Sequence, residues 1–273
     1  MTSDRIGIHS YKLLESRLTV LKGLEAHLIL ENKEEFKKTY RNILGILNTE
    51  VNTTVLALTL EEYSHILGVG IKNRVPFVCT KELPKSHIVA EALHLEKKEV
   101  ELNLKLKGGI HGFTSKFMVD KATTFSNAGS WMDFNVVLTL LIYGIVLFLK
   151  IEDFMDLAAI HIFLMKNHIP TNVTDTYYSN HVRTQKKKGT IICCIPLLYI
   201  WFISHLPSKG PFIENKGNLK WSQRIMSLNA EDISWYSRSY DNVKLIHNNG
   251  DFLNVPLLCT KGGINYNPRL ALC

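Results

Sequence analysis

The chain has 273 residues, of which 46% are apolar, so it can bury one large or two small hydrophobic cores and is not a disordered tail. Lysine and arginine number 32 against 25 acidic residues, and the net charge of +7 favours contact with phosphates or acidic proteins without specifying either. The five cysteines form no C-x-x-C pair, which argues against a zinc site or a disulfide framework and suits a reducing compartment.

The N-terminal part has the spacing of helices. Leucines recur every three or four residues from Leu14 to Leu28, and a similar apolar pattern runs from Phe36 to Leu47. The stretch TLEEYSHILG, residues 59–68, follows with a capping threonine at its start and Gly68 at its end. Each of the three segments is therefore predicted to contain a helix. No secretory signal precedes them, so we expect a protein that is not secreted.

Residues 99–109, EVELNLKLKGG, alternate apolar and polar side chains as a strand does. Because no second alternating run lies nearby to pair with them, we predict a helix that continues from IVAEALHL. Further helices are predicted at residues 115–125, 130–149 and 154–164, from Pro196 onward, and at 221–228. The Asn- and Gly-rich tail from Asn248 onward is predicted to be loop.

Two apolar runs raise the question of a membrane. The run Phe134–Leu149 has 16 residues and would span roughly 24 Å as a helix, which is shorter than a bilayer core of roughly 30 Å. The run Ile191–Leu206 is equally long and follows a basic cluster, as a membrane segment often does. We predict that both are core helices, with residues 130–149 at the centre of an irregular, mainly α-helical bundle; a membrane anchor through 134–149 or 191–206 is the alternative.

Motifs for catalysis or metal binding are weak. KGGI occurs twice, at residues 107–110 and 261–264, without the context of a phosphate-binding loop, and is predicted to form ordinary turns. His87 and His94, like His161 and His168, lie seven residues apart, which is not the spacing of a metal site. Acidic residues such as Asp153 and Asp156 are placed where helix N-termini favour negative charge. We therefore assign no catalytic, cofactor-binding or metal-ligating residue.

One basic cluster could contact nucleic acid. Tyrosines accompany it in the sequence, and cations next to aromatic rings can hold a phosphate backbone and stack bases. More basic residues follow at Lys209, Lys216, Lys220 and Arg224. The hypothetical contact residues are Arg183, Lys186, Lys187 and Lys188.

Several segments taken in order resemble a known family: LTLEEYSHILGVGIKNRVPF, AEALHLEKKEVELNLKLKGGIHGFTSKFM, LIYGIVLF followed by AIHIFL, and DTYYSNHVRTQKKKGTIICCIPLLYIWFISHLP. The chain resembles a plant, chiefly legume, domain of unknown function that is related to the plant mobile domain and is also called aminotransferase-like. The resemblance implies a plant protein with a largely helical domain of retrotransposon-associated origin. For the related plant mobile domain it implies a nuclear role in transposon silencing. It implies no catalytic residues, and no lysine here has the context of a cofactor Schiff base, so no cofactor is expected.

The resemblance also suggests domain limits. It divides the chain into an N-terminal helical segment, residues 1–35, and a plant-mobile-domain-like helical domain, residues 36–270. Compared with the family pattern, the chain is shortened near residues 48–58 and stops at Cys273, where relatives continue. Both differences would remove core partners and predict marginal folding.

Three functional hypotheses remain open. The first is a non-catalytic helical interaction domain of transposon-associated origin, nuclear or cytoplasmic, with protein partners and a link to nucleic acid or silencing complexes. The second is an enzyme acting on nucleic acid whose groups meet only in the folded chain, and a cleft of converging buried ionisable groups would favour it. The third is a membrane-anchored protein.

Overall fold

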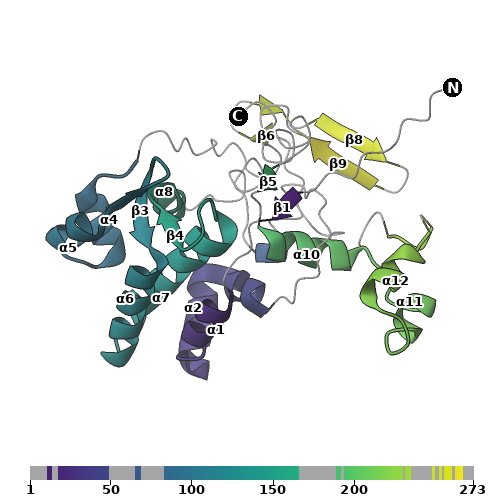
Figure 1. The fold of residues 1–273 in the computed structure, drawn as a ribbon, viewed down its shortest axis with the longest axis horizontal. Helices are drawn as coiled ribbons and strands as arrows, with labels where there is room; N and C mark the ends of the chain where they lie inside the picture. Colours follow the sequence, from purple (N-terminus) through teal and green to yellow (C-terminus); the bar gives the residue numbers. More distant parts are fainter. Residues whose placement is uncertain are drawn as a thin grey trace.

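The described part of the chain is mainly helical, as predicted (Figure 1). The computed structural model describes residues 11–13, 18–48, 65–68, 83–165, 189–191, 194–229, 231–234, 248–249, 252–253, 255–259 and 262–266. Its longer helices lie between residues 18 and 204, and short strands form four small sheets.

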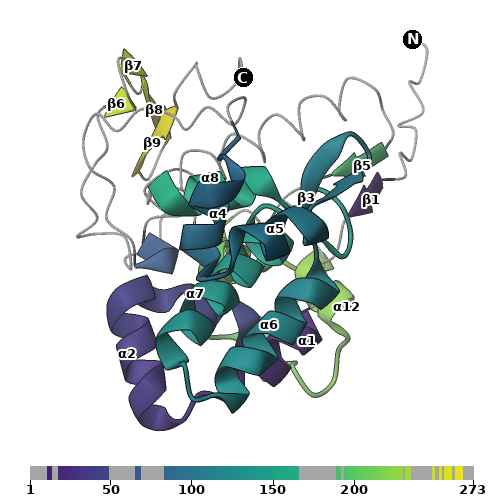
Figure 2. The same cartoon turned by 90° about the vertical axis from the view of Figure 1, so that its left-hand side faces the viewer.

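The first apolar run forms the centre of the fold. Helix α7 (Trp131–Ile142) continues without a break into one π-helical turn, η2 (Tyr143–Leu147). Every side chain from Phe134 to Leu149 except the half-buried Val136 is buried. Helices α1, α2, α4, α6 and α8 all contact α7, so neighbours cover it from several directions (Figure 2). The prediction of a central apolar helix is confirmed.

The N-terminal helices form one wall of this core. They are α1 (Leu18–Glu25), α2 (Leu30–Tyr40) and the 3₁₀ helix η1 (Arg41–Asn48). Leu21, Leu24 and Phe36 are buried on their inner faces, as the leucine and aromatic spacing predicts. Leu14 lies outside the described residues. Side chains from both sides of residue 35 share the same hydrophobic core, and the proposed division of the chain there stays a prediction.

The capped helix predicted at residues 59–68 is described only in its last turn, residues 65–68. Gly68 has φ +64° there, the left-handed conformation expected of a C-terminal cap. Thr59 and Glu62 lie outside the described residues.

Residues 97–114 correct the prediction of one continuous helix. Helix α4 (Ser86–Leu93) ends at His94, which has φ 53°, and α5 (Lys97–Asn103) is separate from it. Strands β2 (Lys105–Lys107) and β3 (Ile110–Thr114) then form an antiparallel hairpin. Gly108 and Gly109 have φ of 57° and 79°, as a two-residue hairpin turn requires. The prediction failed because the partner strand, IHGFT, does not alternate, although it lies only two residues away.

Strand β4 (Phe154–Asp156) corrects the next prediction, since the expected helix from Phe154 begins three residues later as α8 (Leu157–Met165). Strand β4 pairs with β3 and completes a sheet of order β2-β3-β4. Asp156 accepts a hydrogen bond from the Ala158 amide at 2.9 Å and caps α8, which confirms the helix-terminal role assigned to this carboxylate. Helix α6 (Ser115–Asn127) follows β3 directly and runs to the turn before α7.

The second apolar run is less enclosed. Helix α10 (Ile195–Ser204) has proline in its first turn, as predicted. Cys194, Leu197 and Phe202 are buried, whereas Ile203 remains 37% exposed. In the part of the chain that the structure describes, no helix combines the length and apolarity that a membrane crossing requires.

Two short hairpins correct the prediction of a loop from Asn248 onward, whereas the helix predicted at residues 221–228 is present. Backbone pairing, which side-chain composition does not reveal, defines these strands. Helices α11 (Pro211–Glu214) and α12 (Trp221–Met226) precede β6 (Asn248–Asn249), β7 (Phe252–Leu253), β8 (Val255–Cys259) and β9 (Gly262–Tyr266). Strands β1 (Tyr11–Leu13) and β5 (Gly189–Ile191) pair in parallel.

The two KGGI copies differ in structure. The first forms the β2–β3 turn, as predicted. In the second copy, Gly262 and Gly263 already pair with Cys259 and Leu258 as part of β9, so the prediction of a turn is wrong for these two glycines.

Candidate nucleic-acid interface

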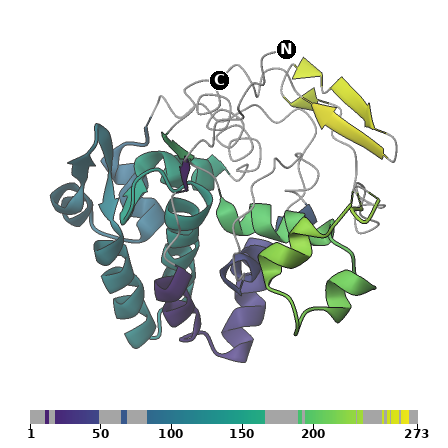
Figure 3. The same cartoon turned by 45° about the vertical axis from the view of Figure 1, so that its right-hand side comes forward.

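The basic cluster predicted to contact nucleic acid, Arg183 and Lys186 to Lys188, lies outside the described residues. The basic residues that follow it in the sequence do lie within them. They belong to residues 207–229, here called the α11–α12 lobe, which extends beyond α10 at one side of the molecule (Figures 1 and 3).

The surface of the α11–α12 lobe is positively charged. Lys209, Lys216 and Lys220 are exposed, and Glu214 is the one acidic residue within residues 207–229; exposed Glu231 and Asp232 follow directly, and the Asn229 amide donates to Asp232 Oδ2 at 2.8 Å. Lys209 lies in a bend before α11, Lys216 in the turn after α11, and Lys220 directly before α12. Ammonium groups on flexible side chains suit contact with phosphate oxygens, which carry no sequence information.

Arg224, the fourth cation of the lobe, has a different position from the lysines. It is buried, its Nη1 donates to the Phe212 carbonyl oxygen at 2.9 Å, and its guanidinium lies over the rings of Phe212 and Trp221, at 4.9 Å and 5.2 Å from their centroids. A cation over two aromatic rings that also contact each other stabilises the packing of α11 against α12. Trp221, one helical turn before Arg224 in the sequence, could have indicated this contact.

His205 and Ser234, which lie on either side of the lobe in the sequence, are hydrogen-bonded to each other. The Ser234 amide donates to the His205 carbonyl oxygen at 2.9 Å, and His205 Nδ1 donates to the Ser234 carbonyl oxygen. The His205 ring also packs on Trp201 of α10, with ring centroids 4.6 Å apart. These contacts anchor both ends of the segment that contains the lobe to the end of α10. They limit how far the lysines of the lobe can move. No motif in the sequence signals this closure.

A cavity of about 420 Å³ lies at the start of α6, and ionisable side chains line it as the enzyme hypothesis requires. The apolar side chains that line the cavity are Val20 of α1, Val119 of α6, Ile145 of η2 and Leu149. The polar lining residues are Lys107, Thr114, Ser115, Lys116, Glu152 and Asp153. Sequence reasoning did not bring these residues together, because they come from a hairpin, a helix and a distant loop.

Ionisable groups do meet in this cavity, but they are not buried. Lys107, Lys116 and Glu152 are exposed, and Asp153 is half-buried. Lys107 Nζ donates to the Glu152 carbonyl oxygen at 2.9 Å, and the Ser115 hydroxyl donates to Asp153 Oδ1 at 3.5 Å. These contacts join the β2–β3 turn and the start of α6 to the loop before β4. The arrangement lacks the buried ionisable groups that the enzyme hypothesis asks for.

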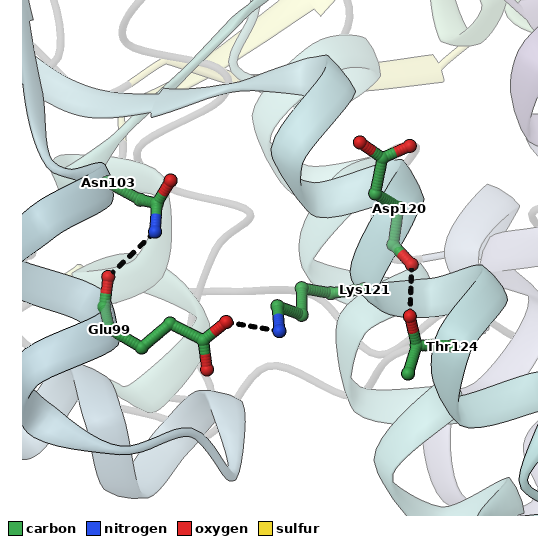
Figure 4. Close-up of polar contacts among 5 residues, drawn as sticks. All are labelled: Glu99, Asn103, Asp120, Lys121 and Thr124. Carbon is green, nitrogen blue, oxygen red and sulfur yellow. Dashed lines mark hydrogen bonds and ion pairs between the residues drawn. The ribbon is translucent and has the colours of Figure 1, made fainter.

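Other charged side chains connect helices. Lys121 of α6 forms an ion pair with Glu99 of α5, and Asn103 Nδ2 donates to the Glu99 carbonyl oxygen at 2.9 Å (Figure 4). The Thr124 hydroxyl donates to the Asp120 carbonyl oxygen at 2.8 Å within α6 (Figure 4). The ion pair between Lys121 and Glu99 is a structural contact that joins α6 to α5.

The histidines singled out in the sequence are separated. His94 Nδ1 pairs with Asp133 in the first turn of α7, whereas His161 lies on α8. His168 lies outside the described residues. Among the residues that the structure describes, no three histidine, cysteine or acidic side chains gather as metal ligands would.

Two tyrosines pack inside the core. Burial raises the pKa of the Tyr143 phenol well above its ordinary value of 10.0, and nearby Tyr40 raises it further. Burial also raises the pKa of Tyr40. The Tyr143 ring meets Phe163 edge-on, with centroids 5.4 Å apart. Both phenols therefore stay neutral near pH 7 and act as packing groups.

The fold and surface define a mainly α-helical domain with a central apolar helix and a basic lobe. A family model described as "domain of unknown function" (DUF7745) matches residues 54–273, so the chain belongs to this family. Neither the curated proteins nor the solved structures contain a match. The family match thus includes the α11–α12 lobe and the lining of the cavity apart from Val20 of α1, and it begins after α1, α2 and η1.

Proposed function

We propose that this chain is a non-catalytic helical interaction domain that binds nucleic acid through its α11–α12 lobe, together with Arg183 and Lys186 to Lys188. The observation that carries the proposal is the division of roles in the lobe: Lys209, Lys216 and Lys220 face solvent, while Arg224 holds the lobe together from inside. The resemblance to the plant mobile domain supports a transposon-associated origin and a nuclear or cytoplasmic location. Protein partners in a silencing complex are part of the same proposal.

The proposed binding to nucleic acid would be driven by the release of counterions from the phosphate backbone. Each lysine that neutralises a phosphate displaces a condensed cation, so affinity falls as salt is added. Because ammonium groups contact phosphates and not base edges, binding should depend little on base sequence. The half-buried Trp221 is held by Arg224 within the lobe, so backbone contact is a better expectation here than base stacking.

Fluorescence anisotropy with labelled single- and double-stranded 20-mers tests the proposal. The chain with Lys209, Lys216 and Lys220 all changed to Ala should bind at least about 10-fold more weakly, and the slope of log affinity against log salt should fall by about 1 per lysine. A matched control changes Lys22, Lys38 and Lys98 to Ala, which removes the same charge from exposed positions on α1, α2 and α5. Equal losses in both triple variants would show that net charge alone drives binding.

A second candidate is an enzyme acting on nucleic acid at the cavity beside α6. The cavity favours it because Glu152, Asp153 and Ser115 line one hollow next to two lysines. Incubation of the chain with plasmid DNA and Mg²⁺ tests this candidate. Cleavage that disappears in both Glu152→Gln and Asp153→Asn would replace the non-catalytic proposal, and unchanged cleavage in both variants would point to a contaminating nuclease.

A further inference from the structure

The cavity at the start of α6 combines an apolar lining with a charged one. Among its apolar side chains, Ile145 and Leu149 are buried, Val119 is half-buried and Val20 is 40% exposed. The apolar lining therefore extends from the hydrophobic core to the surface. The volume of about 420 Å³ lies within the range of sites that bind small molecules.

The innermost part of this lining has a fixed shape. Ile145 belongs to η2, the π-helical turn that continues α7, and π-helical turns within helices are frequent at functional sites. A Cβ on the neighbouring Gly144 would collide with Met155 of β4, so the turn is packed tightly against that strand. The apolar lining at Ile145 is therefore formed before any ligand binds.

Two acids and one lysine of the charged lining contact other residues around the cavity. Lys107 Nζ donates to the Glu152 carbonyl oxygen at 2.9 Å and lies 5.9 Å from the centroid of the Phe154 ring. Asp153 Oδ1 accepts from the Ser115 hydroxyl at 3.5 Å, and the Ser115 amide donates to the Asp153 carbonyl oxygen at 3.0 Å. These contacts fix the loop before β4 to the start of α6.

The second lysine, Lys116, differs from the first. Its ammonium group is exposed and forms no hydrogen bond or ion pair with the residues that the structure describes. It lies in the first turn of α6, a helix of 13 residues whose N-terminus adds a partial positive charge. The charge of Glu152 is screened by water, because that side chain is exposed. The cavity therefore offers one unpaired cation beside an apolar lining.

We infer that this cavity binds a small amphipathic carboxylic acid. Its carboxylate pairs with Lys116, and its hydrocarbon part lies against Val119, Ile145 and Leu149. An amine would be repelled by Lys116 and Lys107, and a phosphate ester, with up to two negative charges, would meet stronger repulsion from Glu152 than a carboxylate does. The inference does not depend on nucleic-acid binding by the α11–α12 lobe.

Isothermal titration calorimetry at pH 7 with matched ligands tests the inference. Octanoate should bind, and hexanoate, which lacks two methylene groups, should bind roughly 10-fold more weakly. Octylamine has the same hydrocarbon chain with the opposite charge and should bind at least about 10-fold more weakly than octanoate. This series separates the contribution of the apolar lining from that of the charge.

Variants assign the two parts of the site. Lys116→Met removes the charge and should weaken octanoate binding at least about 10-fold, while binding of octan-1-ol stays unchanged. Lys38→Met is the matched control, since it removes one charge from an exposed position on α2 and should bind octanoate like the unchanged chain. Val119→Phe occupies the cavity and should weaken octanoate and octan-1-ol alike. Circular dichroism verifies that each variant is folded.

Four results would overturn the inference: no binding of octanoate, octylamine binding as tightly as octanoate, equal weakening by Lys38→Met, or undiminished binding in Val119→Phe. Flotation with phosphatidylcholine vesicles that contain oleic acid distinguishes a free acid from one held in a membrane. Binding to these vesicles by a chain that fails to bind octanoate would assign the surface to a membrane and contradict a site for a free acid.

Discussion

Helices α7 and α10 arise from apolar runs of equal length, yet the fold treats them differently. In the described part of the chain, α1, α2, α4, α6 and α8 contact α7, and Ile142 near its end is fully buried. Helix α10 packs on η1, and its Ile203 keeps 37% of its surface exposed. The comparison shows that an apolar run indicates that a helix is buried. How completely its side chains are buried depends on the elements that pack against it.

Substitution of matched isoleucines should give the largest difference between the two helices. Ile142→Ala removes methyl and methylene groups from an enclosed site and should lower the free energy of unfolding by about 3 kcal/mol. Ile203→Ala should cost about 1 kcal/mol or less, because water already reaches the side chain. Urea unfolding followed by circular dichroism measures both values. Equal losses would mean that α10 is as enclosed as α7.

Tight packing where α7 continues into η2 should give the next largest effect. A Cβ on Gly144 would lie 2.2 Å from Met155 Cγ, so Gly144→Ala forces Met155 to move and should cost about 2 kcal/mol. Gly23 of α1 is the control, since a Cβ there meets nothing within 4 Å and Gly23→Ala should stabilise the helix by about 0.5 kcal/mol. A neutral result at Gly144 would show that Met155 has room to shift.

The helical part of this fold was predictable, since the spacing of Leu21, Leu24 and Phe36 and the unbroken apolar run around Ile142 require buried faces. The strands were not. Residues 105–107 alternate as a strand does, but their partner, residues 110–114, shows no pattern, and β4 has only three residues. Pairing between backbones and the close approach of Gly112 and Gly144 to Met155 depend on tertiary packing, which no local window contains.

The candidate site was predictable only as a set of basic residues. Sequence spacing suggested Lys209, Lys216, Lys220 and Arg224 together, and only the structure separates the buried Arg224 from the exposed lysines. The cavity beside α6 combines Lys107, Ser115 and Glu152, which lie up to 45 residues apart in the chain.

The start of α8, which packs beside α7, depends on a buried carboxylate, and its removal should have an effect as large as that of Gly144→Ala. Asp156 caps α8 and accepts from Lys150 Nζ at 3.1 Å. Asp156→Ala removes both contacts and should cost about 2 kcal/mol, while Asp156→Asn can keep the cap and should cost about 1 kcal/mol. Thermal unfolding of the two variants measures the difference. Indistinguishable losses would mean that the cap contributes little.

The smallest expected effect is the pH dependence of the α7 region. Burial raises the pKa of Tyr143 above its ordinary value of 10.0, so above about pH 10 the unfolded chain loses a proton that the folded chain keeps. Stability from this group is therefore fully present below pH 10 and is lost as the pH rises above it, by up to about 1.4 kcal/mol per pH unit. Tyr143→Phe should reduce this alkaline slope, and Tyr40→Phe should reduce it less because Tyr40 is only half-buried. Urea unfolding between about pH 9 and pH 11 measures the slopes. An unchanged slope in Tyr143→Phe would mean that water reaches the phenol and that this end of α7 is open like α10.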